Sequence, residues 1–150
     1  MSTHYAGTET ENLILDTWIK LNRANNSVGH ILRHNLDGHG LTMTQFGVLE
    51  ILEHLGSLPL KTIGEKILLS SSNLVTVIDN LEKQGLVNRQ KNPDDRRSVM
   101  VCLTDKGKST LQPIFQSHLK QLIDCFSILN LDELKVLGEL SKILGLNQRA

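Results

Sequence analysis

Two groups of residues near the middle of the chain have the chemistry to bind nucleic acid. The first is the polar run Ser70-Ser71-Ser72-Asn73, which stands directly before an apolar stripe with helical spacing. Backbone N–H groups at a helix N-terminus can bind phosphate, and short polar side chains can reach base edges. The second group is basic: residues 83–108 carry seven Lys and Arg against three Asp, a net charge of +4, in a chain with 16 charges of each sign. A local positive patch can bind phosphates although the whole chain is neutral.

Other kinds of chemistry find little support in the sequence. It contains no G-x-S-x-G, phosphate-binding glycine loop, C-x-x-C or H-E-x-x-H, so we expect no enzymatic activity and no cofactor. His30 and His34 stand four residues apart, as zinc ligands can, but such a pair is usually a solvated helix face and we assign no metal site. Cys102 and Cys125 show no paired spacing, which indicates a reducing compartment. A site that responds to a metal ion or to oxidation of a thiol remains an alternative.

The elements that must position these groups are mainly helices. Apolar residues recur at helical spacing from about 11–36, and the capping pattern Thr42-x-x-Gln45 opens a second helix. A short third helix is predicted to open at Pro59, and the serine run precedes a fourth helix that ends before Gly85.

Two further helices are predicted towards the C-terminus. Thr104 caps the first of them, which runs to about Ser127 and contains Pro113, a residue that should bend it. A second capping pattern, Asn130-x-x-Glu133, opens the last helix.

A β-hairpin is predicted between the fourth and fifth helices. Residues 86–91 and 98–103 read as strands, and the tip between them carries Arg96 and Arg97. The alternation of the second strand places Cys102 on its outward side. Two short helices followed by this hairpin predict a winged helix-turn-helix, so the fold class is mainly α with a small β-hairpin wing.

Four blocks of the sequence resemble the MarR family of bacterial regulators. They are residues 41–49 (LTMTQFGVL), 77–87 (VIDNLEKQGLV), 94–98 (DDRRS) and 103–107 (LTDKG). The resemblance implies one domain over residues 1–150, with the function of a DNA-binding transcriptional regulator.

The resemblance also implies how this domain is organised. Helices at about 11–36 and 105–147 would form a homodimer, and a winged helix-turn-helix at about 42–104 would bind double-stranded DNA. The recognition helix would enter the major groove, and Arg97 of the wing would enter the minor groove. Asp95 could hold Arg97 in place through a charge-assisted pair, and Val75 could contact a thymine methyl group. The candidate DNA-binding residues are Ser70, Ser71, Ser72, Asn73, Val75, Thr76, Lys83, Arg89, Lys91, Asp95, Arg96 and Arg97.

Regulation by a small molecule is a second expectation from the resemblance. Members of the family often lose DNA affinity when an effector binds, and a small aromatic or phenolic ligand is the default. Each candidate for lining such a cleft could equally be a core residue. These candidates are Trp18, His30, His34, Phe46 and Leu55.

The sequence thus predicts a cytoplasmic repressor that binds a pseudo-palindromic operator as a homodimer and is released by a ligand. No apolar run is long enough to cross a membrane. The predicted recognition helix has no cation before Lys83. A helix-turn-helix module that binds a partner protein is therefore the alternative.

Overall fold

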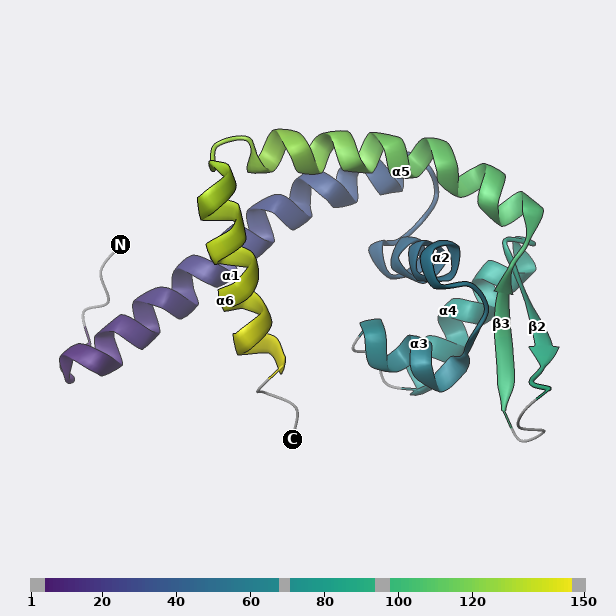
Figure 1. Cartoon of the computed structure of the whole chain (residues 1–150), viewed down its shortest axis with the longest axis horizontal. Helices are drawn as coiled ribbons and strands as arrows, with labels where there is room; N and C mark the ends of the chain where they lie inside the picture. The colour runs from purple at the N-terminus through teal and green to yellow at the C-terminus, as the bar shows by residue number, and fades with distance from the viewer. Residues whose placement is uncertain (1–4, 68–70, 94–97, 147–150) are drawn as a thin grey trace.

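The computed structural model describes residues 5–67, 71–93 and 98–146. They form a long arm, made by the helices at 9–37, 105–126 and 131–146, and a smaller body, made by the helices and strands at 43–103 (Figure 1). The elements are, in chain order, α1 (Glu9–Asp37), α2 (Met43–Leu55), β1 (Leu58–Pro59), α3 (Leu60–Ile67), α4 (Ser71–Lys83), β2 (Val87–Lys91), β3 (Val99–Leu103), α5 (Asp105–Phe126) and α6 (Leu131–Leu146). This confirms the predicted fold class, with one addition to the wing.

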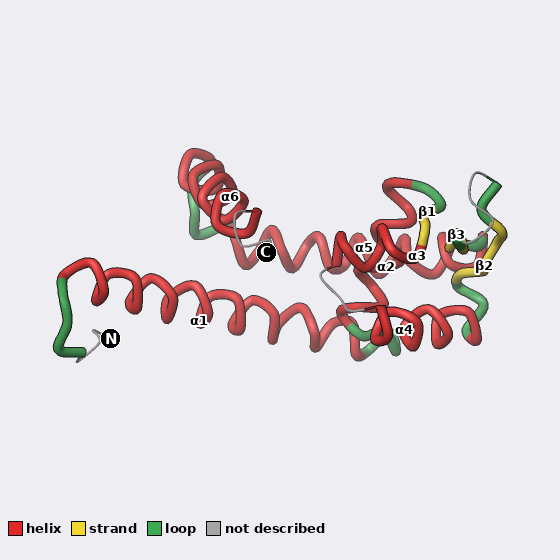
Figure 2. The backbone as a smooth tube through the Cα atoms, turned by 90° about the horizontal axis from the view of Figure 1, so that it is seen from below, coloured by secondary structure: helices red, strands yellow, loops and turns green. Residues whose placement is uncertain are grey.

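Helix α1 begins earlier than the predicted start at residue 11. The Thr8 hydroxyl accepts a hydrogen bond from the Glu11 N–H at 3.2 Å, and the Glu11 carboxylate accepts one from the Thr8 N–H at 2.7 Å. This reciprocal capping box satisfies two of the N–H groups that a helix start leaves unpaired. Helix α1 therefore has 29 residues, and its N-terminal half projects far beyond the body (Figure 2).

The wing has three strands instead of the predicted two. Strand β3 lies in the centre, antiparallel to β2 through pairs from Val87 with Leu103 to Lys91 with Val99. Strand β1 pairs with the other edge of β3, where Pro59 lies opposite Met100. Proline is tolerated on an edge strand because the outer edge needs no N–H donor. The helix predicted to open at Pro59 consequently begins one residue later.

Cys102 corrects a second expectation about the wing. Its side chain is only 8% exposed, although the alternation of the strand placed it on the outward side. The neighbouring Val101 is fully buried as well. Because consecutive strand residues point to opposite faces, both faces of β3 are covered at this end. Cys102 is therefore a packed residue.

The apolar core lies in the body and against the near ends of α1 and α5. Its members come from every part of the body, with Phe46 and Leu49 on α2, Ile63 on α3 and Ile78 on α4 among them. By contrast, α6 has no buried residue among those described.

Helix α5 stays continuous through Pro113. Figure 1 draws α6 across α1, but Figure 2 shows that the two helices stand apart.

None of the helices in the described ranges combines the length and the hydropathy needed to cross a bilayer.

Candidate nucleic-acid interface

Helix α4 presents two different faces. Leu74, Ile78 and Leu81 are buried in the core, because they recur at helical spacing on one side. The exposed side carries polar and small residues that the sequence predicted as DNA contacts. Those within the described side chains are Ser72, Asn73, Val75, Thr76 and Lys83.

Asn80 is an exposed residue that the predicted set lacks. It follows Thr76 by four residues and Asn73 by seven, so the three side chains share one helix face. Lys83, three residues further on, extends this row. The helical spacing alone would have found Asn80 once the core face was fixed.

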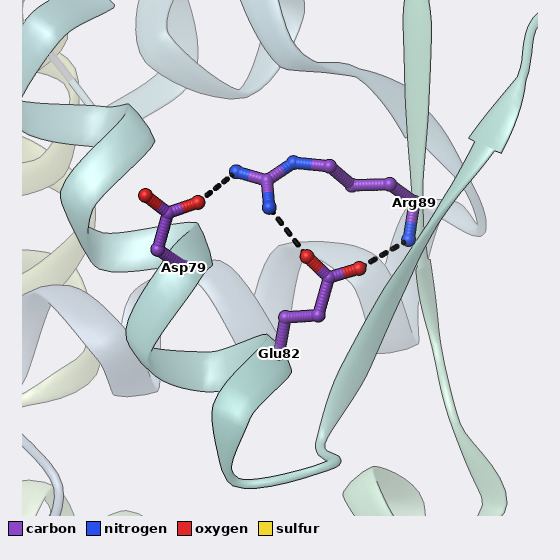
Figure 3. Close-up of polar contacts among 3 residues, drawn as sticks. All are labelled: Asp79, Glu82 and Arg89. Atoms are coloured by element: carbon purple, nitrogen blue, oxygen red, sulfur yellow. Dashed lines mark hydrogen bonds and ion pairs between the residues drawn. The ribbon is translucent and has the colours of Figure 1, made fainter.

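Arg89 is held by α4 instead of being directed to solvent (Figure 3). Its guanidinium donates to the carboxylates of Asp79 and Glu82, and its backbone N–H donates to Glu82 at 3.0 Å. Partial burial acts to lower the pKa of Arg89, but the hydrogen bonds and charges of the two carboxylates outweigh burial and raise it. Arg89 therefore fastens β2 to α4, which favours a positioning role over the predicted direct contact with DNA.

A side-chain hydrogen bond joins the two strands of the wing beyond their last backbone pair, Lys91 with Val99. The Asn92 side-chain amide donates to the Ser98 hydroxyl at 2.7 Å. Lys91 is exposed at the end of β2, beside this closure. The tip of the wing therefore begins at the end of β2, the strand that Arg89 fastens to α4. The candidates Asp95, Arg96 and Arg97 lie outside the described residues, as does Ser70, and the side chain of Ser71 is not described.

The start of α5 is fastened to the turn after α4. The Thr104 hydroxyl donates to the Gly85 carbonyl at 2.7 Å, and the Lys106 ammonium donates to the Gln84 carbonyl at 2.6 Å. Gly85 has a φ of 71°, a conformation that L side chains rarely adopt. Gly107 packs so closely that a Cβ atom there would lie 2.1 Å from the carbonyl oxygen of Leu86. Helix α4, the wing and α5 are therefore joined at one point.

The structure does not bring the predicted effector residues together. Phe46 is 2% exposed and belongs to the core, where its ring centre lies 4.5 Å from that of His118. Trp18 is 58% exposed on the projecting half of α1, and Leu55 is exposed at the end of α2. His30 and His34 line one cavity, of about 410 Å³. The described residues contain no group of three side chains suited to hold a metal ion.

A larger cavity, which the sequence did not indicate, opens between α2 and α5. Its volume is about 550 Å³, within the range of small-molecule sites. One wall comes from α2 and the other from the first half of α5. Its lining residues are Glu50, Glu53, His54, Asp105, Lys108, Ser109, Leu111, Gln112 and Phe115.

The chain is similar to known regulators along most of its length. The sequence pattern of the MarR family matches residues 41–99. The HTH-type transcriptional regulator MhqR of Bacillus subtilis (strain 168) is 38% identical over 135 residues, which cover 90% of this chain and 93% of that protein. AbsC, a MarR family transcriptional regulator from Streptomyces coelicolor, has a similar crystal structure, with a TM-score of 0.86, 25% identity and coverage of 98% of this chain and 99% of AbsC.

A further likeness shows the fold alone. Sco3205, a MarR family transcriptional regulator from Streptomyces coelicolor solved in complex with DNA, has a TM-score of 0.86 at 22% identity, over 98% of this chain and 93% of that one. The matched family pattern and the similarity to MhqR and AbsC agree with the winged helix-turn-helix formed by α3, α4 and the wing. The chain therefore belongs to the MarR family of winged helix-turn-helix transcriptional regulators, which are not enzymes.

Proposed function

We propose that the protein is a homodimeric repressor that binds a pseudo-palindromic operator and is released by a small ligand. The observation that carries this proposal is the exposed row Asn73, Thr76, Asn80 and Lys83 on α4, held beside the wing by Arg89. Amide and hydroxyl side chains can hydrogen-bond base edges in the major groove, whose width admits a helix. The DNA would be chromosomal, which places the protein in the cytoplasm.

The wing would supply the contacts that the recognition helix lacks. Asn73, Thr76 and Asn80 carry no charge, so they add little to the attraction between the protein and phosphates. Lys91 lies at the base of the wing tip, and the sequence puts Arg96 and Arg97 within the tip. We expect Arg97 to enter the minor groove, where a narrow groove attracts arginine.

The dimer is supported by apolar surface on the arm. Among the described residues, twenty large apolar side chains are at least 36% exposed, and sixteen of them lie on α1, on α5, on α6 or in the turn between α5 and α6. Monomeric proteins rarely expose a contiguous apolar patch above a few hundred Å². Burial of these helices against a second copy would pair the two winged regions, with recognition helices about 34 Å apart in successive major grooves.

Ligand release would act through the contact between α2 and α5. The cavity has one wall on each helix, so a ligand there would favour one relative placement of the two helices. A ligand shifts this equilibrium only by its difference in affinity for the two placements. A small aromatic or phenolic compound is our proposed class, since Phe115 and His54 both line the cavity and pack edge to face, with ring centres 5.7 Å apart.

Selection of bound duplexes from a random pool tests the function directly. We expect an inverted repeat whose half-sites are separated by about one helical turn of DNA. Binding should be salt-sensitive, and Arg97→Ala should weaken it and reduce the slope of log affinity against log salt by about 1. Absence of DNA binding at about 50 mM salt would contradict the proposal and favour a protein-binding module.

A further inference from the structure

The last turn of α4 is closed by the backbone of the residues that follow it. The Leu86 N–H donates to the Leu81 carbonyl at 3.0 Å. The Gly85 N–H donates to the Glu82 carbonyl at 2.8 Å. These two bonds form a Schellman motif, which needs the left-handed conformation that Gly85 adopts, with a φ of 71°. The motif leaves the carbonyl of Gln84, at the cap, without a partner in its own helix.

The start of α5 supplies the donor for this carbonyl. The Lys106 ammonium, in the first turn of α5, donates to the Gln84 carbonyl at 2.6 Å. A cation at the C-terminal end of a helix is also attracted by the partial negative charge that the helix dipole places there. Beside it, the Thr104 hydroxyl donates to the carbonyls of Gly85 and Leu86 at 2.7 and 3.1 Å. The end of α4 is therefore bonded to the start of α5.

This junction is one of two places where the body is held on α5. Helix α4 itself packs mainly against α2, α3 and β2, and α2 packs against α5. Phe46 of α2 lies against His118, whereas Lys106 lies nearer the start of the helix, where α5 leaves the wing (Figure 1). The two residues of α5 are separated by about 18 Å along the helix axis. A body held at one place can turn about it, and a second contact at this separation fixes its direction.

We propose that Lys106 is a positioning residue for operator recognition, because its bond to Gln84 fixes the direction of α4 relative to the arm. The inference rests on the dimer and the operator of the proposed function, and it names a residue that sets the accepted spacing between half-sites. One base pair added between two half-sites moves one of them by about 3.4 Å and turns it by about 35° around the duplex. A dimer whose two α4 helices are held in one direction therefore binds one spacing well and its neighbours poorly.

The bond from Lys106 joins the DNA-binding part to the arm and does not hold the DNA-binding part together. Arg89 fastens the wing to α4 through Glu82, and the buried face of α4 keeps the helix in the core. Loss of the Lys106 ammonium therefore leaves the contacts with one half-site in place and loosens their placement relative to the second copy. Lys106 is exposed, so its replacement leaves no cavity in the core.

Operators with different spacers test this role. Three duplexes carry the selected inverted repeat with its own spacer, one base pair more or one base pair less, and a fourth carries a single half-site. For the native protein we expect an altered spacer to weaken binding by about thirtyfold, because the duplex must twist to fit. Lys106→Met keeps the length of the side chain and removes its donor.

In Lys106→Met the spacer penalty should shrink. Affinity for the operator with its own spacer should fall about tenfold, the effect of one hydrogen bond from a charged group, while affinity for the altered spacers changes little. The penalty then becomes about threefold. Affinity for the single half-site should stay the same, which also shows that the variant is folded.

Control variants separate the bond from the charge. Lys106→Arg retains a charged donor and should keep most of the spacer penalty. Lys120→Met removes an exposed lysine of α5, about four turns further along, and should keep the whole penalty. The slope of log affinity against log salt should not change in Lys106→Met, whereas loss of a cation that contacts phosphate would reduce it by about 1.

The outcomes distinguish this inference from the proposed function. An equal spacer penalty in the native protein and in Lys106→Met would overturn the inference and leave the dimeric repressor in place. Native protein that binds all three spacers equally would overturn it too. A reduced salt slope together with weaker half-site binding would make Lys106 a DNA contact and overturn the positioning role. Native protein that binds none of the duplexes would refute the proposed function itself.

Discussion

Arg89 and Glu82 are joined twice, once through the Arg89 backbone N–H and once through its guanidinium. The two residues belong to different elements, since Glu82 lies in the last turn of α4 and Arg89 lies in β2. A double contact fixes the direction of the strand as well as its distance from the helix. Helix α4 and the wing are thereby set at one angle, as the proposed reading of two grooves at once would require.

Loss of this clamp should affect geometry more than charge. In Arg89→Met we expect the free energy of unfolding to fall by about 1 kcal/mol, a small effect because the carboxylates are more than a third exposed. Affinity for the operator should fall, since the wing is no longer held. The slope of log affinity against log salt should stay unchanged, because Arg89 is not expected to contact phosphate.

Lys91→Met is the matched control on the same strand. Lys91 is exposed and is the last residue of β2, where the wing tip begins. Its loss should leave the free energy of unfolding unchanged and lower the salt slope by about 1. If Arg89→Met also lowered the slope, Arg89 would be a DNA contact and our assignment would be wrong.

The tight contact at Gly107 predicts a strong effect on stability. A methyl group at this position would meet the Leu86 carbonyl oxygen at 2.1 Å and the Leu103 side chain at 2.7 Å. We expect Gly107→Ala to reduce the free energy of unfolding by about 3 kcal/mol, measured by urea denaturation at fixed protein concentration.

Gly47→Ala tests the reason for that loss. Gly47 lies within α2, and apart from its chain neighbours and the nearby backbone of the helix, no heavy atom comes within 4 Å of a Cβ placed there. Alanine favours a helix over glycine by up to about 1 kcal/mol, so this variant should be as stable as the native protein or more stable. Equal losses in both variants would show that packing at Gly107 is not the cause.

His118 predicts a pH dependence of stability. Burial lowers the pKa of its imidazole in the folded protein, and the charge of Glu50 opposes this only in part. The unfolded chain therefore takes up a proton first as the pH falls. The stabilisation is complete above pH 6.5, the ordinary value, and is lost as the pH drops from there towards the folded pKa.

The measurement is the urea midpoint between pH 7.5 and 5. His118→Leu should remove part of the fall in midpoint at low pH, because leucine takes up no proton. His34→Gln, which alters an exposed histidine of α1, should retain the fall seen in the native protein. A fall of the same size in His118→Leu would mean that other groups cause it.

Local signals in the sequence were sufficient to predict most of the helices. The capping pattern Thr42-x-x-Gln45 forms as predicted, with hydrogen bonds of 2.9 and 3.2 Å, because both partners lie within one turn. Asn130 and Glu133 do the same at the start of α6. Such patterns depend on neighbours in the chain, so no knowledge of the tertiary structure is needed.

The features that sequence reasoning missed all depend on contacts between distant segments. Strand β1 has two residues, too few for any periodicity, and exists because β3 offers it an edge. In the sequence, Arg89 is one of several cations in a basic segment. Its carboxylate partners, Asp79 and Glu82, can be recognised only once the position of α4 is known. Phe46 and Trp18 both fit an apolar helix face, yet one is buried in the body and the other exposed on the arm.

The uncharged residues of the row on α4 predict a separation of specificity from overall affinity. Thr76→Ala and Asn80→Ala should each reduce discrimination between the selected operator and a single-base variant by about 1–3 kcal/mol at the contacted base pair. Binding to random duplex should change little, since neither side chain carries a charge. Ser109→Ala alters an exposed hydroxyl on α5, away from the row, and should preserve discrimination. Competition titrations at one salt concentration measure the difference. Equal weakening on operator and random duplex would show that these side chains contact the phosphate backbone and do not read bases.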